Sequence, residues 1–308
     1  MSAVSSQHIS PVNITTSELI ALNRKIRGLS LRTHLISALQ SGDYQSAFKG
    51  RGMEYDESRL YQPGDDIRNI DWRVTARSGK THTKLFREER ERPVHLWVDL
   101  RSPMFFATRG RYKSVRAAEL ASLFAWIAIN QGDRVGGIVF SDDEHHELKP
   151  QRGKSAVLRL IKTMTNVPGW QTKSFDANKP YRLDSLLNLR RLVKPGSLVI
   201  LISDFRGYDE QARTHLIATR RHSEMIMIHL YDEIETILPP KGIYRLSNGD
   251  DEIQLDTSDQ QFQHDYKQRF QDRQKQLITL ARRSHFNYIA CRTNEEPETI
   301  VREGLRQR

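Results

Sequence analysis

The sequence predicts an α/β fold in which helices cover both faces of a mostly parallel sheet. Short apolar runs suited to buried strands, such as residues 94–98 and 198–202, alternate with stretches that have the apolar spacing of helices. This alternation is typical of parallel sheets flanked by helices. Two of the runs lead directly into an aspartate, Asp99 and Asp204. Because ligands gather at the carboxyl ends of such strands, both carboxylates are expected at one edge of the sheet.

The N-terminal part is predicted to contain a tail and a helical segment. Residues 1–14 are expected to be a disordered tail, and residues 15–48 a helical N-terminal arm. Thr15 followed by Glu18 is a capping-box pattern, and apolar residues follow at helical spacing. A second helical stretch is predicted over residues 32–40.

The remaining chain is predicted to contain three segments. Residues 49–92 are dense in Gly, Arg, Asp and aromatic residues, which predicts turns and short strands. Residues 93–292 are predicted to form the α/β domain, and residues 293–308 a C-terminal tail or helix. Within the domain, strands are expected at 94–98, 134–140, 198–202, 225–230 and 286–291, helices at 112–130, 155–164 and 265–284, and a hairpin at 243–255 around the turn pair Asn248-Gly249.

Composition and charge argue against several classes of protein. The formal net charge is +10, but acidic residues are interleaved with the basic ones, so no nucleic-acid partner is expected. No apolar run approaches the roughly 18 residues of a membrane span, and the polar N-terminus lacks the apolar core of a signal peptide. The only cysteine is Cys291, so no internal disulfide can form. A cytoplasmic protein is expected.

Three short motifs resemble known sites and are rejected. Gly79-Lys80-Thr81 and Gly153-Lys154-Ser155 resemble phosphate loops, but Val74 and Leu148 stand where the motif needs its first glycine. His145-His146-Glu147 lacks the second histidine that a zinc protease helix supplies one turn later, so a polar loop is predicted there. There is no Gly-x-Ser-x-Gly elbow, and no catalytic residue is predicted.

Asp99 and Asp204 are the clearest candidates for chemistry. Two carboxylates at one sheet edge can hold Mg²⁺ together with hydroxyl groups and water, or they can cap helices and bond to loops. A metal-dependent hydrolase or nuclease would combine them with acids such as Asp65 or Asp71 in a cleft. A nucleic-acid-binding protein is a further alternative, and it would need one continuous basic face.

A long segment after residue 50 carries a family resemblance. Residues 52–55 (GMEY) and 59–77 (RLYQPGDDIRNIDWRVTAR) resemble domain of unknown function family 58, whose members are encoded beside MoxR-type AAA+ ATPases. The resemblance continues through Asp99, residues 132–136 and Asp204 and covers roughly residues 45–295. It implies a von Willebrand factor A-like fold. It also implies a non-enzymatic interaction module that acts with such an ATPase on an unidentified client, in assembling, activating or remodelling protein complexes.

The resemblance also places a degenerate metal site at the sheet edge. Von Willebrand factor A domains bind a metal ion through Asp-x-Ser-x-Ser after the first strand, a threonine from a second loop and an aspartate after a later strand. Here Asp99 and Asp204 match the two aspartates, but Arg101 and Pro103 stand at the two serine positions.

These replacements predict that no metal cofactor is bound. Proline supplies no ligand, and a guanidinium beside two carboxylates competes with a divalent cation. Ser102 lies one place off the pattern, and Thr172 and Ser174 are poor substitutes for the threonine. A weak Mg²⁺ site formed by Asp99, Ser102 and Asp204 is the disfavoured alternative. Arg101 is expected near Asp204, and its removal is expected to favour Mg²⁺.

The family motif has two possible roles. Its acids and bases could form a salt-bridge network that holds the segment against the sheet, or they could form a partner-binding surface. Trp72 is expected to be a packed anchor. The candidate positions are Arg59, Tyr61, Gly64, Asp65, Arg68, Asp71, Trp72 and Arg77.

Overall fold

The protein divides into two compact units, each with its own β-structure. The sheet unit comprises residues 1–33 and 92–308, and the motif unit comprises residues 34–91. Every helix within the described ranges is too short or too polar to cross a bilayer. The computed structural model describes residues 10–31, 53–88, 91–171, 184–247 and 252–306.

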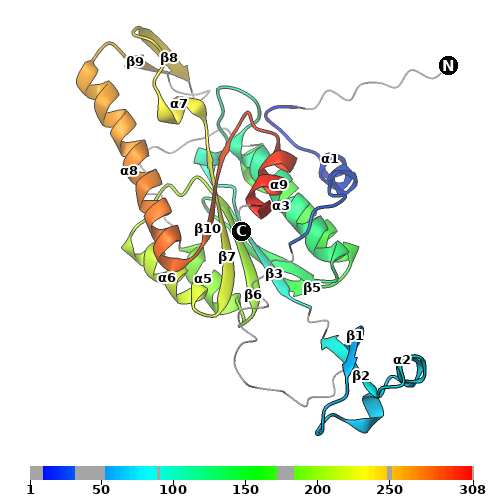
Figure 1. Cartoon of the computed structure of the whole chain (residues 1–308). Helices are drawn as coiled ribbons and strands as arrows, with labels where there is room; N and C mark the ends of the chain where they lie inside the picture. The colour runs from blue at the N-terminus through cyan, green and yellow to red at the C-terminus, as the bar shows by residue number, and fades with distance from the viewer. Residues whose placement is uncertain (1–9, 32–52, 89–90, 172–183, 248–251, 307–308) are drawn as a thin grey trace, which may run out of the picture. The chain divides into compact units, whose positions relative to one another are not determined.

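The sheet unit is built on a six-stranded sheet in the order β10-β7-β6-β3-β4-β5 (Figure 1). All neighbouring strands are parallel except β4 and β5, which are antiparallel. The predicted α/β fold with a mostly parallel sheet is therefore confirmed. The strands are β3 (Pro93–Asp99), β4 (Arg134–Phe140), β5 (His145–Gln151), β6 (Ser197–Ser203), β7 (Ser223–Tyr231) and β10 (Asn287–Arg292).

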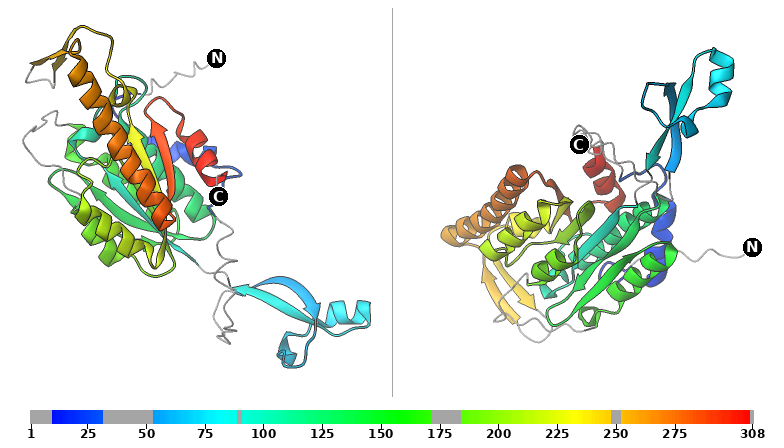
Figure 2. Two further views of the ribbon diagram at one scale, coloured as in Figure 1. Left: turned by 60° about the vertical axis from the view of Figure 1, so that its left-hand side comes forward. Right: turned by 90° about the horizontal axis from the view of Figure 1, so that it is seen from below.

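Helices cover both faces of this sheet and enclose one apolar core on each side (Figure 2). One core lies under α1 (Thr16–Ala21), η1 (Leu22–Lys25), α3 (Lys113–Asn130), α4 (Lys154–Thr165) and α9 (Pro297–Arg306). The other lies under α5 (Ser185–Leu192), α6 (Glu210–Arg220) and α8 (Gln260–Ser284). The shorter elements are η4 (Ser102–Met104), η5 (Pro168–Trp170), α7 (Glu233–Thr236), β8 (Ile243–Ser247) and β9 (Glu252–Asp256).

Burial explains the most apolar stretches of the sequence. Strand β6 is buried at every position, because it is a central strand covered on both faces. Helix α3 is buried through residue 128, since it lies between the sheet and the outer helices. Helix α1 packs on it, with Trp126 Nε1 donating to the carbonyl of Leu19 at 3.2 Å. The capping box of Thr15 is present, and the helix expected at 32–40 lies outside the described residues.

Some local predictions differ from the structure. The loop expected at His145-His146-Glu147 is wrong, because these residues begin the edge strand β5, where only Leu148 is buried. An edge strand can be this polar because most of its side chains face water. Helices α5 and α6 were not predicted, being short and rich in charge. The hairpin of β8 and β9 is confirmed, although its Asn248-Gly249 turn lies outside the described residues.

The motif unit contains an antiparallel pair, β1 (Met53–Leu60) and β2 (His82–Glu88), with η3 (Ile67–Asn69) and α2 (Trp72–Ser78) between them. The two short strands were predicted, but helix α2 was not. It begins at the cap Asp71 and ends at Gly79, whose φ of 69° is left-handed and favours glycine. The expected packing of Trp72 is wrong, because this side chain is 69% exposed.

Candidate functional site

The carboxyl ends of β3 and β6 lie side by side where the order of the sheet reverses. The chain adds β4 and β5 beyond β3 on one side, and β7 and β10 beyond β6 on the other. Open α/β sheets place their ligands at such a switch point. Asp99 ends β3, Asp204 directly follows β6, and both side chains are buried. The structure therefore brings the two predicted carboxylates to one edge.

Asp99 is held by the backbone N–H of Arg101, which donates to Oδ1 at 3.0 Å, and by the Arg101 side chain. Nε and Nη2 of Arg101 donate to the two carboxylate oxygens at 2.9 and 2.6 Å, and Ser203 Oγ donates to Oδ2 at 2.6 Å. The same Nη2 lies 4.0 Å from Oδ1 of Asp204. Arg101 thus stands between the two aspartates, as expected from the sequence.

Lys113, the first residue of α3, neutralises the second aspartate. Its Nζ donates to Oδ2 of Asp204 and to Oε1 of Glu235, both at 2.9 Å, and its side chain is fully buried. Arg206 Nη2 lies 2.5 Å from the same oxygen of Glu235, and the backbone N–H of Arg206 donates to Asp204 at 3.0 Å. We call these six side chains the ion cluster: Asp99, Arg101, Lys113, Asp204, Arg206 and Glu235.

Burial and charge act in opposite directions within the ion cluster. Burial would raise the pKa of Asp204, but the charge of Lys113, supported by Arg206, holds this pKa well below its ordinary value. The pKa of Glu235 is lowered in the same way, with Lys113 outweighing burial. Burial alone would lower the pKa of Arg101. The nearby carboxylates, Asp99 first among them, together have the larger effect, so the pKa of Arg101 is raised. Asp204, Glu235 and Arg101 are therefore charged at neutral pH.

Asp232 fixes the position of Glu235 within the ion cluster. The two residues form the capping box of α7, in which the backbone N–H of Asp232 donates to Oε2 of Glu235 at 3.0 Å. The Asp232 carboxylate also accepts from the backbone N–H of Thr108 at 2.9 Å and from Thr293 Oγ1 at 2.7 Å. These bonds join α7 to the loop after β3 and to the end of β10. Glu235 is thereby held where it can reach Lys113.

The residues at this edge do not fit a Mg²⁺ site. Both oxygens of Asp99 accept bonds from Arg101, and an oxygen of Asp204 is taken by Lys113. A divalent cation would have to displace two tethered cations. The backbone N–H of Ser102 is bonded to Asp142, and Thr172 and Ser174 lie outside the described residues. No group of three or more His, Cys, Asp or Glu side chains could hold a metal within the described part of the chain.

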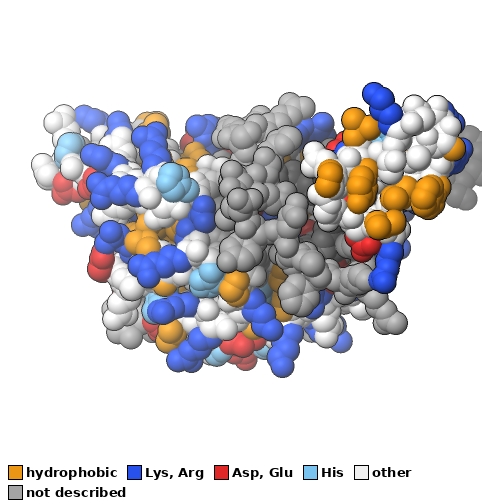
Figure 3. All heavy atoms as spheres, turned by 60° about the horizontal axis from the view of Figure 1, so that its bottom comes forward, with side chains coloured by type: hydrophobic (Ala, Val, Ile, Leu, Met, Phe, Trp, Pro, Cys, Tyr) orange, Lys and Arg blue, Asp and Glu red, His pale blue; other side chains and the backbone are white. Residues whose placement is uncertain are grey.

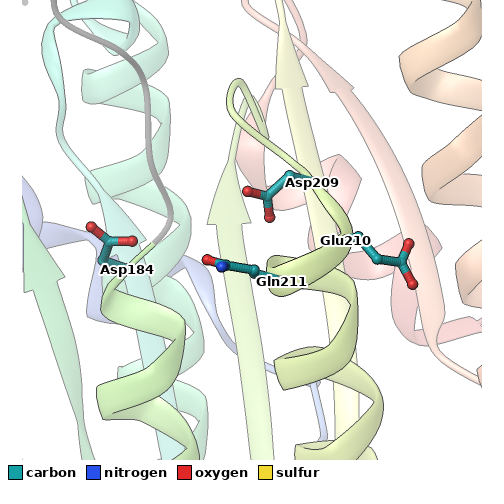
Figure 4. A pocket seen from close by; sticks show the side chains of 4 residues that line it. All are labelled: Asp184, Asp209, Glu210 and Gln211. Carbon is teal, nitrogen blue, oxygen red and sulfur yellow. The ribbon is translucent and has the colours of Figure 1, made fainter.

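A separate pocket of about 330 Å³ lies between the starts of α5 and α6 (Figure 4). It is lined by Asp184, Asp209, Glu210 and Gln211. Asp209 caps α6 by accepting from the backbone N–H of Ala212 at 2.8 Å, and Glu210 points away from the other lining side chains. These carboxylates do not converge as a metal-dependent hydrolase requires.

The acids of the family motif bond within the motif unit. Asp65 pairs with Arg59 at 2.6 Å. Asp71 accepts from Ser58 Oγ at 2.8 Å and from the backbone N–H of Val74 at 3.1 Å, which caps α2. The bond from Ser58 lowers the pKa of Asp71. These acids therefore build the unit itself.

The other predicted motif positions divide into turn residues and exposed residues. The backbone N–H of Tyr61 donates to the carbonyl of Thr81 at 2.8 Å, beside β1 and β2. Gly64 has a φ of 107°, which side chains disfavour, so this turn requires glycine. Arg68, Trp72 and Arg77 are exposed. They are available for a partner.

The motif and the sheet match one protein family as a single stretch. The sequence model of the family described as Protein of unknown function DUF58 matches residues 57–276, most of the chain. The chain belongs to this family. The matched region begins in β1 and ends in α8, so it spans both the exposed motif and the ion cluster.

This DUF58 protein also resembles individual proteins. It is 30% identical over 204 residues to the uncharacterized protein Rv1480 of Mycobacterium tuberculosis and to the uncharacterized protein Mb1516 of Mycobacterium bovis. The alignment covers 65% of this chain and only 62% of each relative. Among solved structures, it is similar to the conserved hypothetical protein BatB from Bacteroides thetaiotaomicron, with a TM-score of 0.44 and 14% sequence identity. That alignment covers 70% of this chain and 98% of the BatB chain. It is also similar to an aerotolerance-related membrane protein from Bacteroides fragilis, with a TM-score of 0.43 and 13% sequence identity. That alignment covers 70% of this chain and 100% of the other chain.

Sequence reasoning missed Lys113, Arg206 and Glu235. Arg206 lies two residues beyond Asp204, so its proximity could have been inferred. Lys113 begins a helix, and a cation at a helix N-terminus is unfavourable unless acids compensate it, which could have indicated a nearby carboxylate. Glu235 carried no signal, since its approach depends on the path of the chain after β7.

Proposed function

We propose that this DUF58 protein is a non-enzymatic interaction module that works with a MoxR-type AAA+ ATPase in assembling, activating or remodelling protein complexes. The ion cluster is the observation that carries the proposal. At the switch point, where an α/β enzyme would place its substrate, Lys113 and Arg101 fill the space between the carboxylates. The carboxylates of this site are engaged by cationic side chains and none is left as a free base, which favours a binding role over a catalytic one.

We further propose that the sheet unit is a von Willebrand factor A-like domain with a degenerate metal site. The strand order supports this assignment, because numbering the strands along the chain from β3 gives 3-2-1-4-5-6 with an antiparallel edge strand. The arrangement of Asp99 and Asp204 at the ends of the first and fourth strands also supports it. Arg101 then occupies the position of the first serine ligand.

Binding to the ATPase is the direct test. The full-length chain and a MoxR-type ATPase from the same organism would be purified separately and mixed without nucleotide, with ADP and with a slowly hydrolysed ATP analogue. Analytical ultracentrifugation should show a complex in at least one state. The absence of a complex in all three states would count against the proposal, as would Mg²⁺-dependent hydrolysis of DNA or phosphate esters by the chain alone.

A further inference from the structure

The motif unit exposes its large apolar side chains. Trp72 is 69% exposed, Ile67 is 66% exposed and Leu60 is 52% exposed. Among the side chains of this unit that the structure describes, the buried ones are Asp71 and Thr83, and both are polar. The described part of the motif unit therefore has no apolar core.

The exposed apolar side chains of this unit gain free energy from an apolar cover. Two strands are marginally stable in water unless an apolar face packs against something else. In Figure 3, hydrophobic side chains gather on the face of the motif unit that is turned to the viewer, with basic and some acidic side chains near its margins. Contiguous exposed apolar groups with a polar rim are typical of interaction sites.

The exposed charges on the helix of this unit are basic. Arg73 and Arg77 are exposed on α2, and Lys80 is exposed just after it. The sequence from Trp72 to Arg87 contains no acidic residue. A partner that covers this helix therefore gains from carrying negative charge.

The nearest acids weaken this positive charge only in part. Asp65 is paired with Arg59, and Asp71 is buried and bonded to Ser58. Both carboxylates are thus engaged inside the unit. Asp66 and Glu57 are exposed acids of the same unit, so they reduce its positive charge without cancelling that of α2.

We propose that the motif unit docks on an acidic protein surface with an apolar centre, into which Trp72 inserts. The inference rests on the proposed function, and the surface then belongs to the MoxR-type ATPase. Tryptophan in an apolar pocket is a frequent hot spot of protein interfaces, and arginine is enriched beside it. Ile67 and Leu60 contact the margin of the same pocket, and the basic side chains of α2 meet its acids.

Two other occupants are less favourable. A second copy of this chain would bring the same basic side chains of α2 to the interface, and the two copies, each with a net charge of +10, would repel each other. A single-stranded nucleic acid could stack a base on Trp72. Ile67 and Leu60 offer no flat ring for a second base, and the exposed Asp66 repels phosphates.

The test measures the affinity of full-length variants for the purified ATPase, in the nucleotide state that binds best. Trp72→Ser and Ile67→Ser should each raise Kd by about ten-fold or more, as truncation of a hot spot does. The matched control is Ile243→Ser in the sheet unit, whose side chain is 67% exposed and should leave Kd unchanged. Arg73→Glu combined with Arg77→Glu should weaken binding most at low salt. Thermal melts verify that each variant is folded.

The outcomes separate this inference from the proposed function. If the wild type binds the ATPase and both apolar variants bind equally well, the docking surface is wrong and the proposed function stands. If the wild type does not bind in any nucleotide state, both are wrong. A third outcome is that Trp72→Ser still binds the ATPase but no longer self-associates or no longer binds a single-stranded DNA oligonucleotide. The surface then belongs to a second copy of the chain or to nucleic acid, and the inference is overturned.

Discussion

Nζ of Lys113 lies 2.9 Å from Oδ2 of Asp204, and both side chains are almost completely buried. The lysine begins α3, where the positive end of the helix dipole disfavours a cation. The charge of Lys113 is therefore compensated by the carboxylates of Asp204 and of Glu235, which lies on α7. This contact joins the central helix to the strand ends at the switch point of the sheet.

Lys113→Met should destabilise the protein by about 3–5 kcal/mol, because removing one partner of a buried ion pair leaves the other charges uncompensated. Urea unfolding at neutral pH measures the change. The control is Lys25→Met, which removes the half-exposed pair between Lys25 and Glu298 and should cost less than about 1 kcal/mol. Equal stability of Lys113→Met and wild type would show that this charge is not needed in the folded state.

The stability should also fall as the pH is lowered from about 6.5 to about 4. His95 and His229 are buried, and desolvation lowers both pKa values from 6.5 to about 4. In this window the unfolded chain binds protons that the folded chain does not, so acidification favours unfolding. His95→Leu removes one such group and should flatten the dependence by about one proton, as measured by urea titrations across the window. An unchanged slope in this variant would contradict the assignment.

Local patterns in the sequence were sufficient to predict the sheet except for its polar edge strand β5, and to predict that its two aspartates lie at one edge. The buried run of β6 and the strand-terminal position of Asp99 required no tertiary information, since parallel strands bring their carboxyl ends to one edge. Arg101 was predicted to lie near Asp204 because it follows Asp99 by two residues.

The rest of the site depended on long-range packing. Glu235 reaches Lys113 only because α7 is tied to Thr108 and Thr293, which are distant in the sequence. Trp72 was expected to be packed because large aromatic side chains usually are. The motif unit has no described core in which to bury it, and no pattern around Asp71 indicated this.

Asp71→Ala should unfold helix α2 locally and leave the sheet unit intact. Loss of an N-cap costs about 0.5–2 kcal/mol, and a helix of seven residues has little stability beyond its caps. Hydrogen exchange of peptides from residues 72–78 should therefore quicken, while exchange in β6 stays unchanged. Faster exchange in β6 as well would mean that the two units unfold together.

The last prediction concerns Mg²⁺. Wild type should show no Mg²⁺-dependent rise in Tm, because Arg101 and Lys113 already occupy the carboxylate oxygens that a metal would need. The sequence alone predicts that Arg101→Ala gains Mg²⁺ affinity, but the structure changes this expectation: the variant should respond little, since the ammonium of Lys113 remains between Asp204 and Glu235. The combined variant Arg101→Ala with Lys113→Ala should be unstable, because Asp99 then lacks its cation and Asp204 and Glu235 keep only Arg206. Millimolar Mg²⁺ should raise the Tm of this variant more than NaCl of equal ionic strength does. A clear Mg²⁺ shift in the wild type would mean that a metal displaces these side chains and that the site is intact.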